Sequence, residues 1–317
     1  MEKQQNVQDL VHYGKYNAIP FHKGGLIGQG SFGKVYKGID PDSKQTIAIK
    51  VIPKSAICKN FNPKSLQREL EPLKSLRGRN LLSYIDLFEC GDNFVTVTEL
   101  CSDGDLGIKI EELSEGLSET QLLNYLKDFL EGYRILFEKK IIHRNIKPQN
   151  LLIHEGTLKI GDFGLARYMN SNLQLTTTLG MGRYKYIAPE VLNEQPYNNL
   201  CDVWSLGVTL CEALLGTVPW EDVQDLEELK NSIARTGETG YKLPVKAQSK
   251  LSELVDSMLR LDPAKRITWE ELFNHPLFKL SPTKQLGANM IEQPLPEEEL
   301  KRESQASNNA SSKRKIK

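Results

Sequence analysis

Three glycines are the first residues whose type and spacing could support chemistry. Gly28, Gly30 and Gly33 form GQGSFG between two strand-like runs, and Lys34 and Val35 follow them. Glycine has no side chain, so its backbone can approach a phosphate group closely. The same spacing serves dinucleotide-binding folds, but there the glycines open a helix and an acidic residue follows about 20 residues later. Here they lead into the strand-like VYKGI, which favours a β-hairpin that can approach phosphate.

A lysine, an amide and carboxylates follow the glycines in a fixed order. Lys50 lies in the β-branched run AIKVI, and Glu69 lies in the helical segment SLQREL. A lysine in a strand is, taken alone, usually a surface residue, so the inference rests on the whole set. The later members of the set are Asn145, Lys147 and Asn150 in HRNIKPQN, and Asp162 in GDFG.

This ordered set resembles the protein kinase family of the Ser/Thr class. That family has a Gly-rich loop, a strand lysine, a helix glutamate, HRDxKxxN, DFG and APE, and APE is present here at residues 188–190. The resemblance runs from about Phe21 to Phe278. It implies a bilobal α+β kinase fold with a small β-rich N-lobe and a larger helical C-lobe.

Hydrophobic patterning predicts elements that agree with two lobes. Strand-like runs extend from Tyr16 to about Leu100, interrupted by one helical pattern at about residues 63–76. Long amphipathic patterns follow, in TQLLNYLKDFLEGYRILFEKK, CDVWSLGVTLCEALLG and SKLSELVDSMLRL. We therefore expect an N-terminal extension (1–20), an N-lobe (21–100), a C-lobe (101–280) and a disordered polar tail (281–317).

The resemblance implies an ATP site with Mg²⁺. It assigns the α and β phosphates to Lys50, the orientation of Lys50 to Glu69, and the metal to Asn150 and Asp162. Asp105 is expected to reach the ribose or, alternatively, only to cap a turn or helix. The residues expected to contact the nucleotide are Ile27, Gly28, Gly30, Ser31, Gly33, Val35, Ala48, Lys50, Thr98 as gatekeeper, Glu99 and Cys101 of the hinge, Asp105 and Leu152.

The chain departs from the family at the catalytic position. Asn145 stands where kinases keep the aspartate that accepts the proton of the substrate hydroxyl, with Lys147 two residues later. A second departure is Arg183, where Ser/Thr kinases usually have a threonine near that aspartate. Removing a general base lowers a rate by about 10²–10⁴-fold. Three interpretations stay open: natural loss or strong weakening of phosphate transfer, residual or unusual chemistry, or an engineered substitution at Asn145.

Other family positions are filled. Arg266 is the expected partner of Glu190, and Asp202 is expected to brace the catalytic loop. Arg144 resembles the arginine that pairs with a phosphothreonine between DFG and APE, and Thr178, in the run of three threonines at 176–178, is our candidate for that modification.

Composition narrows the function classes. The chain has 317 residues, with 41 Lys plus Arg and 41 Asp plus Glu, so no net charge attracts nucleic acid or an anionic membrane. The five cysteines form no zinc-ligand pattern, and no apolar run is long enough for a membrane span or a signal peptide, so we expect the cytosol or the nucleus. Two functions remain: an ATP-dependent kinase acting on a protein substrate, or a pseudokinase that binds ATP and Mg²⁺ and works as a scaffold or allosteric partner of another protein. No residue pattern indicates an oligomeric state.

Overall fold

The computed structural model describes residues 11–18, 25–30, 33–56, 74–113, 116–162, 181–244 and 249–279. The chain divides into the unit Met1–Phe278 and the unit Lys279–Lys317, and the fold reported below is that of the first unit. The helix expected at about residues 63–76 lies almost wholly outside the described residues, and the polar tail at 281–317 lies entirely outside them.

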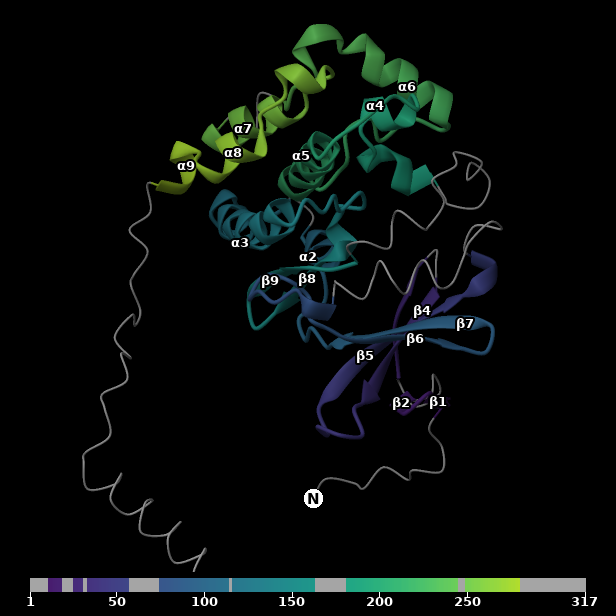
Figure 1. Cartoon of the computed structure of the whole chain (residues 1–317). Coiled ribbons are helices and arrows are strands. Elements are labelled where there is room, and N and C mark those ends of the chain that lie inside the picture. Colours follow the sequence, from purple (N-terminus) through teal and green to yellow (C-terminus); the bar gives the residue numbers. More distant parts are fainter. Residues whose placement is uncertain are drawn as a thin grey trace, which may run out of the picture. The chain divides into compact units, whose positions relative to one another are not determined.

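An antiparallel sheet of seven described strands forms the N-terminal part (Figure 1). The strand order is β1-β2-β4-β5-β7-β6, and β3 also pairs with β4. The strands are β1 (Val11–Tyr13), β2 (Tyr16–Ala18), β3 (Leu26–Gly30), β4 (Gly33–Ile39), β5 (Thr46–Pro53), β6 (Tyr84–Cys90) and β7 (Asn93–Glu99). Strands β1 and β2 form a hairpin within the expected N-terminal extension, and β2 joins the sheet by pairing with β4.

Strand β5 shows why the sheet has two different faces. Side chains alternate along a strand, so Ile47, Ile49 and Val51 share one face while Ala48 and Lys50 share the other. The first three are buried in a hydrophobic cluster, whereas Ala48 and Lys50 are partly exposed. The strand therefore presents its lysine on the face opposite to this cluster.

Helices build the C-terminal part (Figure 1). They are α2 (Leu106–Glu111), α3 (Glu119–Glu138), α4 (Pro189–Leu192), α5 (Leu200–Leu215), α6 (Leu226–Arg235), α7 (Lys250–Met258), α8 (Trp269–Phe273) and α9 (Pro276–Lys279). Short 3₁₀ helices are η3 (Lys54–Ala56), η5 (Pro148–Asn150), η8 (Met181–Tyr186), η9 (Gly237–Thr239) and η11 (Pro263–Lys265). A two-stranded hairpin of β8 (Leu151–His154) and β9 (Thr157–Ile160) lies among them and packs on α3.

The core of this part forms around α3 and α5. Ser118 caps the N-terminus of α3 by accepting a hydrogen bond from the Gln121 backbone, and the helix then buries one stripe of apolar residues. Helix α5 is buried on nearly every side, as its almost unbroken apolar sequence requires, and it ends at Gly216 in the left-handed conformation. No helix in the described part of the chain is long and apolar enough to cross a membrane.

The predicted bilobal fold is confirmed, with a β-rich part followed by a helical part. The patterns that predicted helices correspond to α3, α5 and α7, and the predicted strand-like runs correspond to β3 to β7. Hairpin β8–β9 was not expected. It lies in a segment whose sequence, LLIHEGTLKI, is too short to stand out from its helical surroundings.

Candidate nucleotide and phosphotransfer site

Lys50 of β5 and Asp162 form an ion pair in which the lysine Nζ donates a hydrogen bond to Asp162 Oδ2. Burial acts to raise the pKa of Asp162, but the charge and hydrogen bond of Lys50 act against it, and the pKa lies below its usual value. The Asp162 carboxyl is therefore ionised at neutral pH. Asp162 also has a φ of 53°, a strained conformation for a residue with a side chain and one that often marks a functional site.

Strands β3 and β4 place the glycine loop next to this ion pair. Val35 on β4 lies opposite Lys50 on β5, and Gly28 on β3 lies opposite Val35. Gly33 must be glycine, because a Cβ at this position would lie 2.0 Å from the Val51 carbonyl oxygen. Gly30 pairs with Gly33 at the end of the hairpin, and Ser31 lies outside the described residues.

The predicted adenine-binding hinge follows β7. Register places Ala48 opposite Thr98, and the Thr98 hydroxyl donates to the Glu99 carbonyl at 3.1 Å. The Glu99 carboxylate accepts hydrogen bonds from the Ser83 backbone at 2.8 Å and from Lys159 Nζ at 3.1 Å. These bonds hold Glu99 at the start of the hinge, whose backbone is predicted to hydrogen-bond the adenine base.

Two predicted contact residues meet at the start of α2. Asp105 and Leu152 form an isolated antiparallel bridge, which brings the hinge and β8 together. Asp105 also caps α2, because its carboxylate accepts a hydrogen bond from the Ile108 backbone at 3.1 Å. The capping interpretation is thus confirmed, and the ribose contact stays a prediction. Cys101 is half-buried, with burial raising the pKa of its thiol to about 12, and Ile27 is exposed on β3.

The loop that carries Asn145 is fixed by a buried aspartate. Asp202 accepts hydrogen bonds from the backbone of His143 and Arg144, each at 2.7 Å, and from the Tyr133 hydroxyl at 2.7 Å. The predicted bracing role of Asp202 is confirmed by these bonds. The Asn145 backbone N–H donates to His143 Nδ1 at 3.2 Å.

These contacts define the protonation of His143. His143 Nδ1 must accept a hydrogen bond, because its partner is the backbone N–H of Asn145, which can only donate. His143 Nε2 must donate, because its partner at 2.9 Å is the Gly161 carbonyl oxygen. Burial lowers the pKa of His143 despite the opposing charge of Asp202. His143 is therefore a neutral support for the loop.

Asn150 ties Asn145 to the segment that contains Asp162. Its side-chain nitrogen donates to the Asn145 carbonyl at 2.6 Å, and its own carbonyl accepts from the Gly161 backbone at 2.8 Å. Lys147 joins this group because its backbone carbonyl accepts from the Asn150 backbone N–H at 3.0 Å. The structure thus brings Lys50, Asn145, Lys147, Asn150 and Asp162 into one site.

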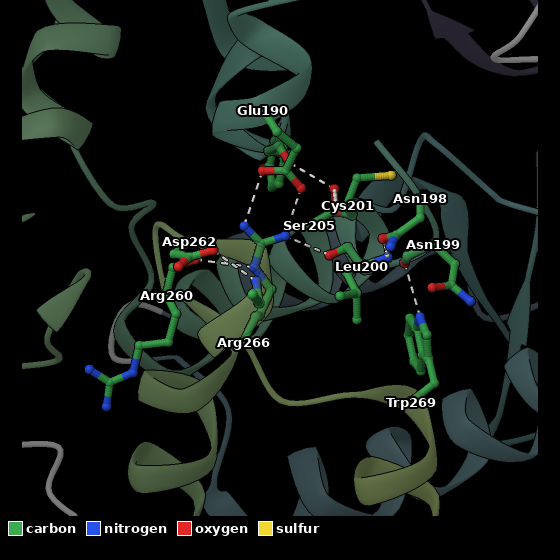
Figure 2. Close-up of polar contacts among 12 residues, drawn as sticks. Glu190, Asn198, Asn199, Leu200, Cys201, Ser205, Arg260, Asp262, Arg266 and Trp269 are labelled. Carbon is green, nitrogen blue, oxygen red and sulfur yellow. Dashed lines mark hydrogen bonds and ion pairs between the residues drawn. The ribbon is translucent and has the colours of Figure 1, made fainter. Parts of the chain in front are cut away.

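Two side chains anchor the segment that contains Arg183 to the helical part of the chain. Within η8, Lys185 Nζ donates to the Glu221 carbonyl at 2.6 Å, and the Tyr186 hydroxyl donates to the Glu212 carboxylate. Glu190 and Arg266 then form the predicted buried pair, at 2.8 and 3.1 Å (Figure 2). Arg266 also donates to the Leu200 carbonyl at 2.8 Å (Figure 2).

Comparison with known proteins agrees with this geometry. Residues 21–278 match the model of the protein kinase domain. The chain belongs to the protein kinase family. It is 36% identical over 264 residues to "Serine/threonine-protein kinase TIO" of Arabidopsis thaliana, and the match covers 82% of this chain and 19% of that protein. The match to "Serine/threonine-protein kinase 36" of Mus musculus has 34% identity and covers 81% of this chain and 19% of that protein. "Serine/threonine-protein kinase atg1" of Dictyostelium discoideum is 34% identical, over 80% of this chain and 38% of that protein.

This chain spans about a fifth of the length of the first two relatives, which are longer proteins. Their identities are too alike to favour one subfamily.

Several kinase positions lie outside the described residues. Glu69 and the threonines at 176–178 are among them, and so is the side chain of Arg183, although its backbone lies in η8. Their predicted roles stay predictions.

Sequence reasoning missed two residues of the kinase site. Lys159 holds the hinge carboxylate from β9, and no local signal marks it because the contact depends on where the β8–β9 hairpin packs. Tyr84 is buried on β6 opposite Thr98, and burial together with the charge of Asp162 raises its pKa well above the usual value. Its position next to the gatekeeper follows from strand register, which a single sequence does not define.

The donor set fits a magnesium ion that shares its ligands with a nucleotide. The described residues contain no cluster of three His, Cys, Asp or Glu side chains able to hold a metal alone. Mg²⁺ in kinase-type sites needs only one or two protein oxygens, because substrate phosphates and water complete the octahedron. Asp162 supplies an ionised carboxylate, and the nitrogen of Asn150 is used by Asn145, so its oxygen is the atom that would face a metal.

Proposed function

We propose that this chain binds Mg·ATP and transfers the γ-phosphate to a serine or threonine hydroxyl of a protein, at a rate that Asn145 lowers. The observation that carries the proposal is the Lys50–Asp162 ion pair beside Asn150. A cation for the phosphates and two oxygen donors for the metal are thus present in one site. Membership of the protein kinase family supports the same assignment.

Bound Mg·ATP would supply the transferable phosphoryl group and a metal that neutralises charge on the phosphates. Lys50 would hold the α and β phosphates, and Lys147 would offset charge on the transferring group. In the transfer, a bond forms between the substrate oxygen and the γ-phosphorus while the bond from that phosphorus to the β-phosphate oxygen breaks. The substrate proton must also leave. An aspartate would accept this proton, whereas the Asn145 amide does not, so the proton passes to a phosphate oxygen or to water.

A pseudokinase is the second candidate, and the geometry of Asn145 favours it. Its backbone N–H donates to His143 Nδ1 and its backbone carbonyl accepts from the Asn150 side chain, and the two bonds hold the residue in place. The side chain held at this point is an amide, which does not accept the proton of a substrate hydroxyl. The chain would then bind Mg·ATP and act through protein partners alone.

Nucleotide binding is tested first by thermal unfolding with increasing Mg·ATP. A ligand that binds only the folded state stabilises it by about 2.7 kcal/mol at a hundredfold excess over Kd. We expect this stabilisation in the parent chain and its loss in Lys50→Met, which removes the cation that faces Asp162. A phosphate-transfer assay with radiolabelled ATP on the same samples then separates the two candidates. Transfer above the Lys50→Met background supports the kinase, binding without transfer supports the pseudokinase, and absence of binding contradicts both.

A further inference from the structure

The hairpin of β1 and β2 covers the face of the sheet that lies behind Lys50. Ile49 and Val51 flank Lys50 on β5 and point to the opposite face. Tyr16 and Ala18 of β2 are buried in the same cluster as these two residues, and Tyr16 is only 2% exposed. The hairpin therefore shares a buried cluster with the strand that presents the lysine.

Close contacts fix the hairpin on the sheet. Ala18 pairs with Gly38 of β4, and the Tyr16 ring stacks on Phe88 of β6 with centroids 5.9 Å apart. Gly14, in the hairpin turn, has a φ of 58°, and a Cβ there would lie 2.9 Å from the Phe88 ring. The turn thus fits tightly against the strand at the edge of the sheet.

Hydrogen bonds connect Tyr16 through Asp86 to Lys74. The Tyr16 hydroxyl donates to Asp86 Oδ2 at 3.2 Å, and Lys74 Nζ donates to Asp86 Oδ1 at 3.1 Å. Lys74 follows Glu69 by five residues in the sequence. Burial acts to raise the pKa of Asp86, but the hydrogen bonds from Lys74, the Leu87 backbone and Tyr16 hold it below its usual value. Asp86 is therefore an ionised link between the hairpin and Lys74.

We propose that Tyr16 is a positioning residue for the nucleotide site. Its ring supports β5 behind Lys50, and its hydroxyl holds the Asp86–Lys74 pair. Within the described residues, Tyr16 packs in the cluster behind Lys50 and bonds to Asp86, so it acts through the placement of Lys50 relative to Asp162. The proposal rests on the proposed function in one respect, since it assumes that this ion pair receives the nucleotide.

The test compares three variants of the full chain. Tyr16→Phe removes the hydroxyl and keeps the stacked ring, and Asp86→Asn removes the charge that accepts from it. Tyr13→Phe is the matched control, because Tyr13 lies in the same hairpin and its ring stacks on Tyr36. Mg·ATP affinity is measured by titration, and the unfolding midpoint is measured without nucleotide.

We expect Tyr16→Phe and Asp86→Asn each to weaken Mg·ATP binding by about two- to tenfold, the range of one hydrogen bond. The double variant should bind no more weakly than the weaker single variant, because both changes disturb the same Tyr16–Asp86 contact. Tyr13→Phe should bind as the parent does. Equal affinities for Tyr16→Phe and the parent would overturn the proposal, as would a fall in unfolding midpoint without any fall in affinity.

A second measurement is independent of nucleotide binding. The rate at which an acetylating reagent modifies Lys50, read by peptide mass spectrometry, reports how firmly Asp162 holds its ammonium. We expect Tyr16→Phe to raise this rate relative to Tyr13→Phe. An unchanged rate rejects the role of Tyr16. If Tyr16→Phe raises the rate and the parent chain binds no Mg·ATP, the result supports the role of Tyr16 and rejects the proposed function instead.

Discussion

Asn145 has a backbone held in place at both of its polar groups. The amide donates to His143 Nδ1 and the carbonyl accepts from Asn150, so neither bond involves the Asn145 side chain. A change of this side chain should therefore alter the chemistry of the loop without altering its path. Weak phosphate transfer then follows from the side-chain amide of Asn145, which cannot accept the proton of the substrate hydroxyl.

The first prediction concerns the coupling of Asn145 to Arg183. Asn145→Asp restores the proton acceptor, but an arginine close to the new carboxylate would pair with it and hold it away from the substrate hydroxyl. The double change Asn145→Asp with Arg183→Thr should then exceed the sum of the two single effects on the logarithm of the rate. Steady-state phosphate transfer by all four proteins measures this coupling. Simple addition of the logarithms would show that Arg183 does not face Asn145.

A pH dependence of stability is expected from His143. Its pKa in the folded protein lies below the unfolded value of 6.5, so below pH 6.5 the unfolded state takes up the proton first. Stability is therefore full above the unfolded pKa and falls with pH toward the folded pKa, by up to about 1.4 kcal/mol per pH unit.

His143→Gln is the variant that isolates this effect, because glutamine can still donate to the Gly161 carbonyl but does not titrate. Urea unfolding between pH 7 and pH 5 should show a steeper loss of stability in the parent than in the variant. Identical slopes would mean that His143 does not lose a proton on folding.

At the scale of elements, the Glu190–Arg266 pair joins α4 to the segment between η11 and α8. Arg266 is 3% exposed and Glu190 is 5% exposed, so removal of one partner leaves a buried charge without its counterion. Glu190→Gln or Arg266→Met should each cost about 3–5 kcal/mol of unfolding free energy.

The exposed pair of Lys230 and Glu227 on α6 is the matched control. The Glu227 side chain is 76% exposed, so Glu227→Gln should change the unfolding free energy by about 0–1 kcal/mol. Urea unfolding of the three variants gives the comparison. Similar small losses at both pairs would contradict the assignment of Glu190–Arg266 as a buried anchor.

Sequence alone predicted those elements whose signal is local. Helices α3, α5 and α7 have strong apolar periodicity, and strands β4 to β7 alternate or are β-branched, so both kinds were found. The nucleotide set could be named because the family motifs lie in order along the chain. Contacts between distant segments could not be predicted. The positions of Lys159 at the hinge and of Tyr16 behind Lys50 depend on how their hairpins pack against the rest of the chain. The sequence within each hairpin does not indicate which segment it packs against.

At the scale of the whole molecule, the described residues form two hydrophobic clusters with different tasks. The larger one, around α3 and α5, supports the catalytic loop through Asp202. The smaller one, formed by residues of β2, β5 and β7, supports the strand that presents Lys50. Mg·ATP binding draws on both, because Lys50 lies on that strand whereas Asn150 and Asp162 lie beside the catalytic loop. Asn145 contacts Asn150 through its backbone carbonyl alone, so a change of the Asn145 side chain should leave binding intact.

Phosphate transfer by the parent chain and by Asn145→Asp, with the Mg·ATP dissociation constant measured on the same samples, tests the central claim most directly. We predict the same dissociation constant for both proteins. We also predict that transfer by Asn145→Asp is faster by part of the factor of about 10²–10⁴ that a general base contributes. Equal transfer rates at equal nucleotide occupancy would contradict the claim that the amide of Asn145 limits this kinase.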